Sequence, residues 1–283
     1  MRRILAQTII ASLVLLVAPV DGRGEDKPTK PLTLEQKKEL QQQRKELVGE
    51  FRKLVRARKI SEAMATQEKV LIVEKKLFGE TPSLIIPRLK ILARDYETLG
   101  QYAAAEKKLQ EIVQIRVGLH GKDHWKTIEA QWIVKDLAQR RRLKPEQRKE
   151  IREVDSLSRH IPRLSAANRY REAFQLAQRV LQVRRRLLGD KHPAYAKSLN
   201  DLAELYRSQS AYAKALPLYR QSRDIFKATL GENNPSYAAS LHNLANLYRE
   251  QGKYANALPL YQQARDIHKA VFGEKHSTYA TSL

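Results

Sequence analysis

The residue types that could do chemistry are few in this chain, and their spacing brings none of them together. Cysteine is absent, which excludes thiol nucleophiles and cysteine-ligated metal sites. His192 and His276 occupy matching places in a repeat, two periods apart, whereas the ligands of a metal must converge on one point. Asp201 and Glu204 fall on a solvated helix face, but a catalytic acid pair needs a pocket that shifts its pKa values. The sequence therefore predicts no catalytic residues, no metal site and no cofactor, and it gives the histidines a role in the connectors between helices.

The composition is that of a strongly basic protein with enough apolar residues to form a core. Glycine and proline number 11 each among 283 residues, which is too few for a collagen-like or turn-rich all-β chain. Hydrophobic residues make up 42% of the sequence, so wholesale disorder is excluded. The 53 Lys and Arg outnumber the 31 Asp and Glu by 22, and residues 23–187 hold 17 of that excess. A surface of this charge attracts anionic partners.

The amino terminus has the pattern of an export signal. Met1-Arg2-Arg3 is followed by an apolar run from Ile4 to Val20, and small residues precede a possible cut after Gly22. Residues 1–22 are therefore predicted to be a signal peptide of an exported protein, periplasmic or secreted. The alternative is a membrane anchor at residues 4–20, although a 17-residue helix rises only about 26 Å against a hydrocarbon core of about 30 Å. Residues 23–34 are predicted to be a flexible linker.

A 42-residue period organises the rest of the chain. Residues 188–229 and 230–271 align without gaps and are identical at 26 of 42 positions, and a third copy begins at Phe272. Fainter copies begin at Phe78 and His120, and the stretch from His120 to the next start, Leu188, is longer than one period, so a further segment is inserted there. We therefore expect a helix pair at 35–77, divergent repeats at 78–187 with an inserted helix near 144–160, and regular repeats at 188–283 with the last one incomplete.

Each repeat has the spacing of two antiparallel helices. Apolar residues recur every three or four positions, a short break follows, and a second such run begins. Small and aromatic residues recur in step, as with Ala203 and Ala215, which return at Ala245 and Ala257. One pair of this kind leaves an apolar face open, so the pairs must stack. The predicted fold is all-α, a right-handed superhelix of antiparallel helix pairs.

Three departures from the repeat predict local differences. Ser210 stands where the matching turn has Gly252. Lys135 takes the place of Ala203 in the repeat that begins at His120, so its helix must pack differently. Pro217 and Pro259 lie in second helices, where each removes a backbone hydrogen bond and predicts a kink or a late helix start.

The repeat resembles the tetratricopeptide repeat in its longer, kinesin-light-chain variety. The text that carries the resemblance is HPAYAKSLNDLAELYRSQSAYAKALPLYRQSRDIFKATLGE and its successor NPSYAASLHNLANLYREQGKYANALPLYQQARDIHKAVFGE. The stretch with Pro145 to Arg148 is also similar to secreted bacterial repeat proteins, many of which continue into a caspase-like protease domain. The resemblance implies a non-catalytic scaffold for protein interactions. The alternative is the amino-terminal regulatory array of a larger enzyme, since Leu283 falls inside a first helix and predicts a truncated array.

The resemblance also implies which residues bind a partner. First helices of the family line the concave face of the superhelix, and their polar residues hold an extended peptide. The corresponding positions in this chain are Lys90, Arg94, Lys197, Asn200, Glu204, Arg207, His242, Asn246 and Arg249. Their Asn side chains can both donate to and accept from a peptide backbone, and their Arg side chains suit carboxylates. We therefore expect a protein or peptide partner with acidic character.

Two basic clusters are candidates for anion binding. They are Arg140, Arg141, Arg142 and Lys144 in the first, and Arg184, Arg185 and Arg186 in the second. The alternative is that these cations only stabilise helix carboxyl ends. A third hypothesis for the whole protein follows from them, namely electrostatic binding of an anionic polymer or a membrane by residues 23–187. Few aromatic residues lie among the cations, which argues against stacking on nucleic acid.

Overall fold

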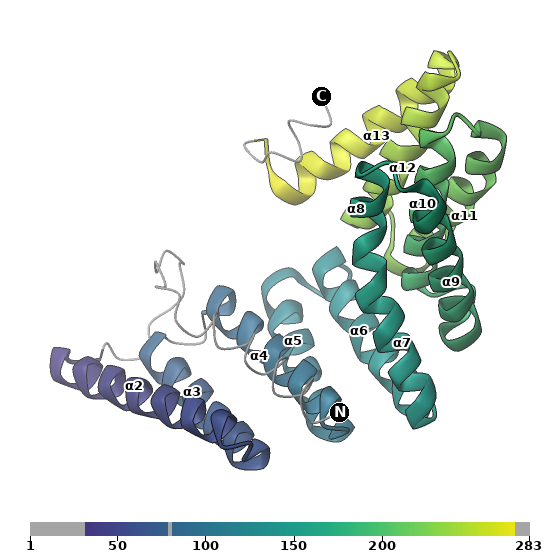
Figure 1. The fold of residues 1–283 in the computed structure, drawn as a ribbon. Helices are drawn as coiled ribbons and strands as arrows, with labels where there is room; N and C mark the ends of the chain where they lie inside the picture. Colours follow the sequence, from purple (N-terminus) through teal and green to yellow (C-terminus); the bar gives the residue numbers. More distant parts are fainter. Residues whose placement is uncertain (1–31, 79–80, 275–283) are drawn as a thin grey trace. The chain divides into compact units, whose positions relative to one another are not determined.

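The computed structural model describes residues 32–78 and 81–274, and all regular structure within them is helical (Figure 1). The prediction of an all-α fold is confirmed. The predicted signal peptide at 1–22, most of the linker at 23–34 and residues 275–283, with His276, lie outside the described residues. No helix that the structure describes has both the length and the apolar character needed to cross a bilayer.

The chain forms two compact units, Met1–Leu119 and His120–Leu283. The helices of the first unit are α2 (Leu34–Arg56), α3 (Ile60–Phe78), α4 (Pro82–Thr98) and α5 (Tyr102–His120). The elements of the second unit are α6 (Trp125–Arg142), α7 (Pro145–Leu157), the 3-10 helix η1 (Ser158–His160), α8 (Ile161–Ala166), α9 (Tyr170–Leu188), α10 (Pro193–Ser208), α11 (Tyr212–Leu230), α12 (Pro235–Glu250) and α13 (Tyr254–Phe272).

An apolar seam joins the first two helices of the first unit. Val48, Phe51 and Val55 of α2 form one buried cluster with Ala63 and Val70 of α3. Phe51 is completely buried in this cluster. The seam makes α2 and α3 an antiparallel pair, which occupies the stretch where the sequence places a helix pair.

Two carboxylates of α3 connect it to the neighbouring helices. Glu74 is buried and accepts hydrogen bonds from Arg44 of α2 at 2.8 Å and from Arg88 of α4 at 3.0 Å. Glu68 accepts a hydrogen bond from the Tyr96 hydroxyl of α4 at 2.9 Å. Removing a partner of the buried Glu74 would leave a charge without compensation, so these contacts hold α3 in place.

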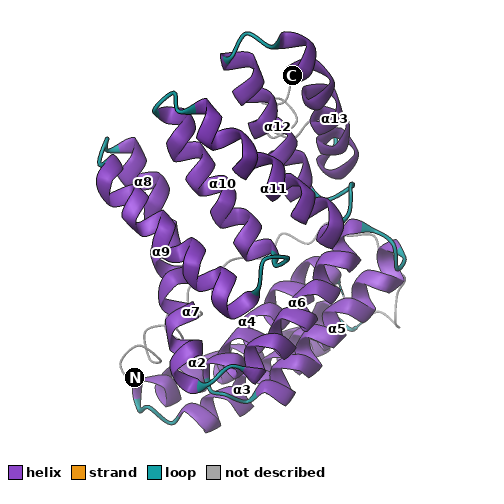
Figure 2. Ribbon diagram, turned by 90° about the vertical axis from the view of Figure 1, so that its right-hand side faces the viewer, coloured by secondary structure: helices purple, strands orange, loops and turns teal. Residues whose placement is uncertain are grey.

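Stacked helix pairs make up the second unit (Figure 2). The pairs α10–α11 and α12–α13 follow the regular repeat, and α9 pairs with the bent segment α7–η1–α8. Where the two helices of a pair cross, the chain has alanines: Ala203 and Ala215 are completely buried, as is Ala245. Tyr219 is also fully buried beside them in the same cluster. The alanines allow the helices to approach closely, and the tyrosine fills the space next to the crossing.

Helix α6 does not form a regular pair. Its carboxyl end is followed almost at once by Pro145, which begins α7. It packs against α11 and against His192 before α10, and it also bonds to α7 and to the end of α9. Trp132 packs against the cluster that contains Phe226 and Leu230 of α11. Its ring also meets His192 edge-on at 4.9 Å between centroids. The different packing that Lys135 predicted is therefore observed.

The connector residues cap the first helices of the repeats. His192 Nδ1 accepts a hydrogen bond from the backbone N–H of Ala194 at 3.0 Å, and the Asn234 side chain one period later accepts from Ser236 at 2.8 Å. His124 caps α6 in the same way. An acceptor at this position satisfies one of the open N–H groups of a helix. The predicted connector role of His192 is confirmed.

The turn inside each regular pair needs a residue with positive φ. Gly252 has φ of 74°, and Ser210 takes the same position with φ of 56°. In both turns the next residue donates its N–H back across the helix end, from Ala211 to the Tyr206 carbonyl at 2.9 Å and from Lys253 to the matching carbonyl of Tyr248 at 2.8 Å. The serine therefore keeps the glycine's conformation at a steric cost.

The prolines do not delay the second helices. Helix α11 begins at Tyr212 and α13 at Tyr254, each five residues before its proline. Of the two predicted outcomes, a kink or a late start, the late start is excluded. Pro217 and Pro259 are exposed, so the carbonyl that loses its partner four residues earlier can be hydrated.

A polar network joins α6 to the rest of the second unit. His192 Nε2 donates a hydrogen bond to Asp136 of α6 at 2.9 Å, because its Nδ1 is already an acceptor. Arg140 bonds to Asp136 at 2.9 Å and to Asp155 of α7 at 3.2 Å. Burial raises the pKa of Asp136, but the hydrogen bond from His192 and the charge of Arg140 outweigh it and hold the pKa below its ordinary value.

Exchanging Ser210 and Gly252 tests how much stability the protein loses by having serine at a positive φ. Ser210→Gly should raise the free energy of unfolding by about 1 kcal/mol, and Gly252→Ser should lower it by a similar amount, because only glycine adopts positive φ without strain. Urea denaturation followed by circular dichroism measures both. Equal stabilities for the two variants would contradict this account.

The network makes stability depend on Asp136 at acid pH. A carboxyl group whose folded pKa is lowered stabilises the protein above its ordinary pKa, and that contribution disappears as pH falls through the folded pKa. The free energy of unfolding should therefore decline below about pH 4, and less so in Asp136→Asn, which should be roughly 1–3 kcal/mol less stable at neutral pH. Asp190→Asn, at an exposed connector position, is the matched control. Parallel pH profiles of wild type and Asp136→Asn would exclude this role.

Candidate functional site

Helices α10 and α12 carry most of the predicted binding residues on matching faces. Spacings of four and then three residues place the side chains along one side of each helix. These residues are Asn200, Glu204 and Arg207 on α10, and His242, Asn246 and Arg249 on α12. The apolar residues between them, such as Leu199 and Leu202, are buried on the opposite side. The structure thus brings six predicted residues together on two adjacent first helices, which we call the first-helix face.

Tyrosines of the second helices anchor this face. The Tyr219 hydroxyl donates to Glu204 at 2.6 Å, and the Tyr261 hydroxyl, one period later, donates to Asn246 at 2.5 Å. Both bonds cross within a helix pair, from α11 to α10 and from α13 to α12. They hold the two acceptor side chains in fixed positions. The recurrence of tyrosine at positions 219 and 261, one period apart, is the sequence signal for this contact.

Other polar contacts join α10 to α12. Asn243 Nδ2 donates to Asn200 Oδ1 at 2.9 Å, and Arg207 forms ion pairs with both Glu204 and Glu250. Asn243 and Glu250 were not among the predicted binding residues, although Asn243 occupies the position that the polar Asp201 has in the preceding repeat. The network connects neighbouring repeats at the surface as the apolar core does below it.

Burial and nearby charged or hydrogen-bonding groups shift the pKa values of Glu204 and His242 on this face. Burial raises the pKa of Glu204, but hydrogen bonds from Arg207 and Tyr219 outweigh that effect and hold the pKa below its ordinary value. Burial, and secondly the charge of Arg249, lowers the pKa of His242. At neutral pH the face therefore presents an ionised Glu204 and a neutral His242 imidazole.

Several donors of this face remain open. Within the part of the chain that the structure describes, the NH2 groups of Asn200 and Asn246 have no hydrogen-bond partner. Arg249 is exposed at the carboxyl end of α12, and Lys197 is exposed on α10, where it pairs with Asp201 at 3.4 Å. Amides and exposed cations in a row can donate to backbone carbonyls and carboxylates of an extended chain.

The two remaining predicted residues lie in the first unit. Lys90 and Arg94 are exposed on α4, and Arg94 Nη2 is 3.3 Å from Asp95. They occupy the same helix position in their own repeat as the residues of α10, but they belong to a different unit from the first-helix face.

The predicted anion-binding residues divide into exposed and engaged groups. Arg141, Arg142, Lys144 and Arg185 are exposed. Arg186 is exposed but pairs with Glu150 at 2.5 Å, and Arg140 belongs to the Asp136 network.

Arg184 lies elsewhere than the sequence led us to expect. Its side chain is only 5% exposed, and it bonds to Asp155 at 2.9 Å, to Ser198 at 2.8 Å and to the Ala194 carbonyl at 3.1 Å. An anion-binding role for this residue is corrected to a structural one, because its donors are used inside the second unit.

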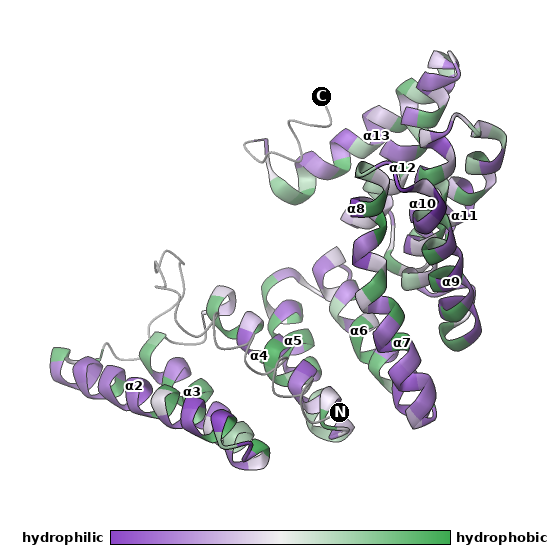
Figure 3. Ribbon diagram, viewed as in Figure 1, coloured by the Kyte–Doolittle hydropathy of each residue, from purple (hydrophilic) through white to green (hydrophobic). Residues whose placement is uncertain are grey.

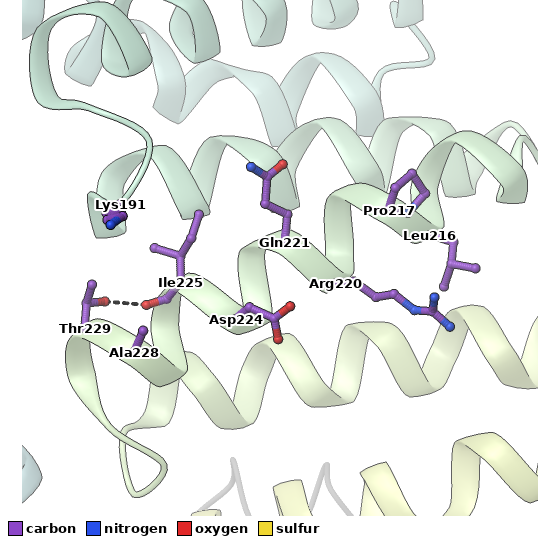
Figure 4. A pocket seen from close by; sticks show the side chains of 9 residues that line it. All are labelled: Lys191, Leu216, Pro217, Arg220, Gln221, Asp224, Ile225, Ala228 and Thr229. Carbon is purple, nitrogen blue, oxygen red and sulfur yellow. Dashed lines mark hydrogen bonds between the residues drawn. The ribbon is translucent and has the colours of Figure 1, made fainter.

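A shallow groove of about 810 Å³ follows one side of α11 (Figure 4). Its walls combine apolar residues such as Leu216 and Ile225 with Arg220 and Gln221, and Lys191 lies at one end. Asp224 in this groove pairs with Arg223 at 2.7 Å. None of the predicted binding residues contributes to it. Among the described residues, no three His, Asp or Glu side chains are grouped to hold a metal ion.

Family profiles match both units of the chain. A tetratricopeptide repeat profile matches residues 164–228, 212–270 and 236–283, and a second profile of the same description matches residues 91–126. Together these matches cover more than half of the sequence. A search of the curated proteins found no significant match.

Solved structures with similar folds include other repeat proteins. The kinesin light chain protein with nearly identical TPR-like repeats from Podosopora anserina is 24% identical over 84% of this chain and 99% of its own, with a TM-score of 0.35. BtubC from P. vanneervenii is 15% identical over 86% of this chain and 94% of its own, with a TM-score of 0.36. The Rap conjugation gene regulator of plasmid pLS20, in complex with the Phr* peptide, is 12% identical over 93% of this chain and 62% of its own, with a TM-score of 0.38. The profile matches and the stacked helix pairs together assign this chain to the tetratricopeptide repeat family, with a fold consistent with a protein-interaction scaffold.

Proposed function

We propose that the first-helix face of α10 and α12 binds an extended segment of a partner protein without catalysing a reaction on it. The proposal rests on Asn200 of α10 and Asn246 of α12, which lie on the same face of successive first helices, each with its oxygen engaged and its NH2 group open. Two amides held in this way can donate to successive parts of a peptide backbone.

The anchoring contacts favour binding because they reduce its entropic cost. Glu204 and Asn246 are held by tyrosines from the paired helices, and Asn200 is held by Asn243. Side chains that are already ordered lose little freedom when a ligand binds. The face is therefore preorganised for a ligand that follows the line from α10 to α12.

Charge favours a segment with acidic side chains. Arg249 and Lys197 are exposed at the margins of the face, and an arginine can bind a carboxylate through two parallel hydrogen bonds. Glu204 counters this preference only in part, because it is paired with Arg207, which also pairs with Glu250.

Replacing the two amides tests the proposal. Peptides selected from a displayed random library by the wild-type protein should bind Asn200→Ala/Asn246→Ala about tenfold more weakly, since two hydrogen bonds are lost. Fluorescence anisotropy with the selected peptides measures the change.

The matched control makes the same substitution elsewhere. Asn233→Ala/Asn256→Ala alters two exposed asparagines outside the face and should bind as wild type does. Circular dichroism verifies that both variants are folded. Equal affinity of the wild type and the Asn200/Asn246 variant would refute binding at this face.

We also propose that the protein acts outside the cytoplasm, on the basis of the signal pattern at residues 1–22. Amino-terminal sequencing of the protein recovered from an extracytoplasmic fraction should begin at Arg23. Recovery of the chain from membranes with Met1 still attached would instead support an anchor at residues 4–20.

A further inference from the structure

The bent segment α7–η1–α8 has a row of exposed cations along one face. Lys149, Arg152, Arg159 and Arg163 follow one another at spacings of three, seven and four residues, which place them within one quarter of the helix circumference. All four are exposed. We call them the basic stripe. It extends about 21 Å, since 14 residues rise by about 1.5 Å each.

The basic stripe points away from the core of the second unit. Ile151, Val154 and Ile161 lie on the opposite side of the same segment, are at most 2% exposed, and pack in one cluster with residues of α9. Hydrophilic residues predominate along much of α7 (Figure 3). The apolar contacts therefore fix the direction in which the stripe faces.

Three of the four carboxylates of α7 are bound by arginines of α9. Glu150 pairs with Arg186 at 2.5 Å, and Glu153 pairs with Arg179 at 2.8 Å. Asp155 is bound by Arg184 of α9 at 2.9 Å.

Glu146, three residues before Lys149, is the remaining carboxylate of α7 and is exposed. The cations of the stripe nevertheless stay outside the ion pairs of α7. Within the described chain, none of the four stripe residues forms an ion pair, and Arg159 bonds only to the Ser156 hydroxyl at 3.2 Å. The four cations are thus free of ion pairs among the described residues, although acidic residues are present in the same helix.

The surrounding sequence reinforces this charge. Residues 140–186 contain 15 Lys and Arg against five Asp and Glu, a net charge of +10. Arg141, Arg142 and Lys144 are exposed immediately before α7. The potential around the stripe is therefore positive, and it would steer an anionic partner toward it.

We propose that the basic stripe binds an acidic segment of a partner protein. Three of its four cations are arginines, whose planar forks match carboxylates. Its length corresponds to about six residues of extended chain, so carboxylates on alternate positions of one strand could meet successive cations.

The composition of the stripe favours protein over the other polyanions. No aromatic residue belongs to it, whereas single-stranded nucleic acid is held by stacking on aromatic rings. The exposed large apolar residues of the described chain, among them Leu34, Ile72 and Leu258, lie outside residues 143–188, whereas helices that lie in a membrane surface carry apolar residues beside their cations. None of its residues belongs to α10 or α12, so this surface is separate from the first-helix face.

Neutralising the stripe in the full chain tests the proposal. A fluorescein-labelled oligoglutamate peptide should bind Arg152→Gln/Arg159→Gln/Arg163→Gln about tenfold more weakly than wild type at physiological ionic strength. The affinity of the variant should also depend less on salt. Arg152→Lys/Arg159→Lys/Arg163→Lys keeps the charge and should lose less affinity.

The control variant removes the same charge from the first unit. Lys37→Gln/Lys38→Gln/Lys45→Gln alters three exposed cations of α2 and should bind the peptide within twofold of wild type. Circular dichroism verifies that each variant is folded. An equal loss of affinity in this control, or no loss in the stripe variant, would overturn the proposal.

Two further probes distinguish the classes of partner. Double-stranded DNA and phosphatidylserine vesicles should bind the wild type more weakly than oligoglutamate does. If either binds more tightly and loses its affinity in the stripe variant, the assignment to an acidic protein segment is wrong. Because the first-helix face is intact in the stripe variant, its selected peptides should still bind, which separates the two proposals.

Discussion

The close approach of two helices at paired alanines is the constraint on which the regular repeats depend. Ala203 meets Ala215 with no exposed surface, and Tyr219 fills the space beside them. A larger side chain at the crossing would force the helices apart and remove the contacts that the tyrosine makes. The same cluster includes Leu244 and Ala245 of the following pair. One crossing therefore fixes both the geometry of its own pair and the surface on which the next pair stacks.

Where the repeat is interrupted, charged contacts replace that apolar crossing. Helix α6 has no second helix of its own, and it is held through Asp136 and Arg140, which reach His192 and Asp155. Arg184 joins Asp155 to the start of α10 from within the unit. Ion pairs of this kind hold a position only when each partner is satisfied. Ion pairs and hydrogen bonds thus hold the irregular segment against its neighbours, whereas close apolar packing holds the regular repeats together.

The same difference explains which surfaces are open to partners. In the regular pairs, tyrosines cross to the first helices and order their polar side chains, as Tyr261 does for Asn246. In the irregular segment, arginines of α9 engage Glu150 and Glu153 of α7, and the cations of the basic stripe form no ion pair within the part of the chain that the structure describes. Two surfaces of different chemistry therefore arise within one unit, one rich in amides and one in guanidinium groups.

The helices and their pairing followed from the sequence alone, because helical periodicity and a 42-residue repeat can be recognised without knowing any tertiary contact. The position of the candidate binding face came from the resemblance to the tetratricopeptide repeat. The role of His192 as a cap was equally local. The sequence could not decide that Arg184 is buried, since its partner Asp155 lies 29 residues earlier, or that Asn243 orders Asn200 from the next repeat. Bonds between distant residues depend on how whole helices pack against one another, and only the tertiary structure determines that packing.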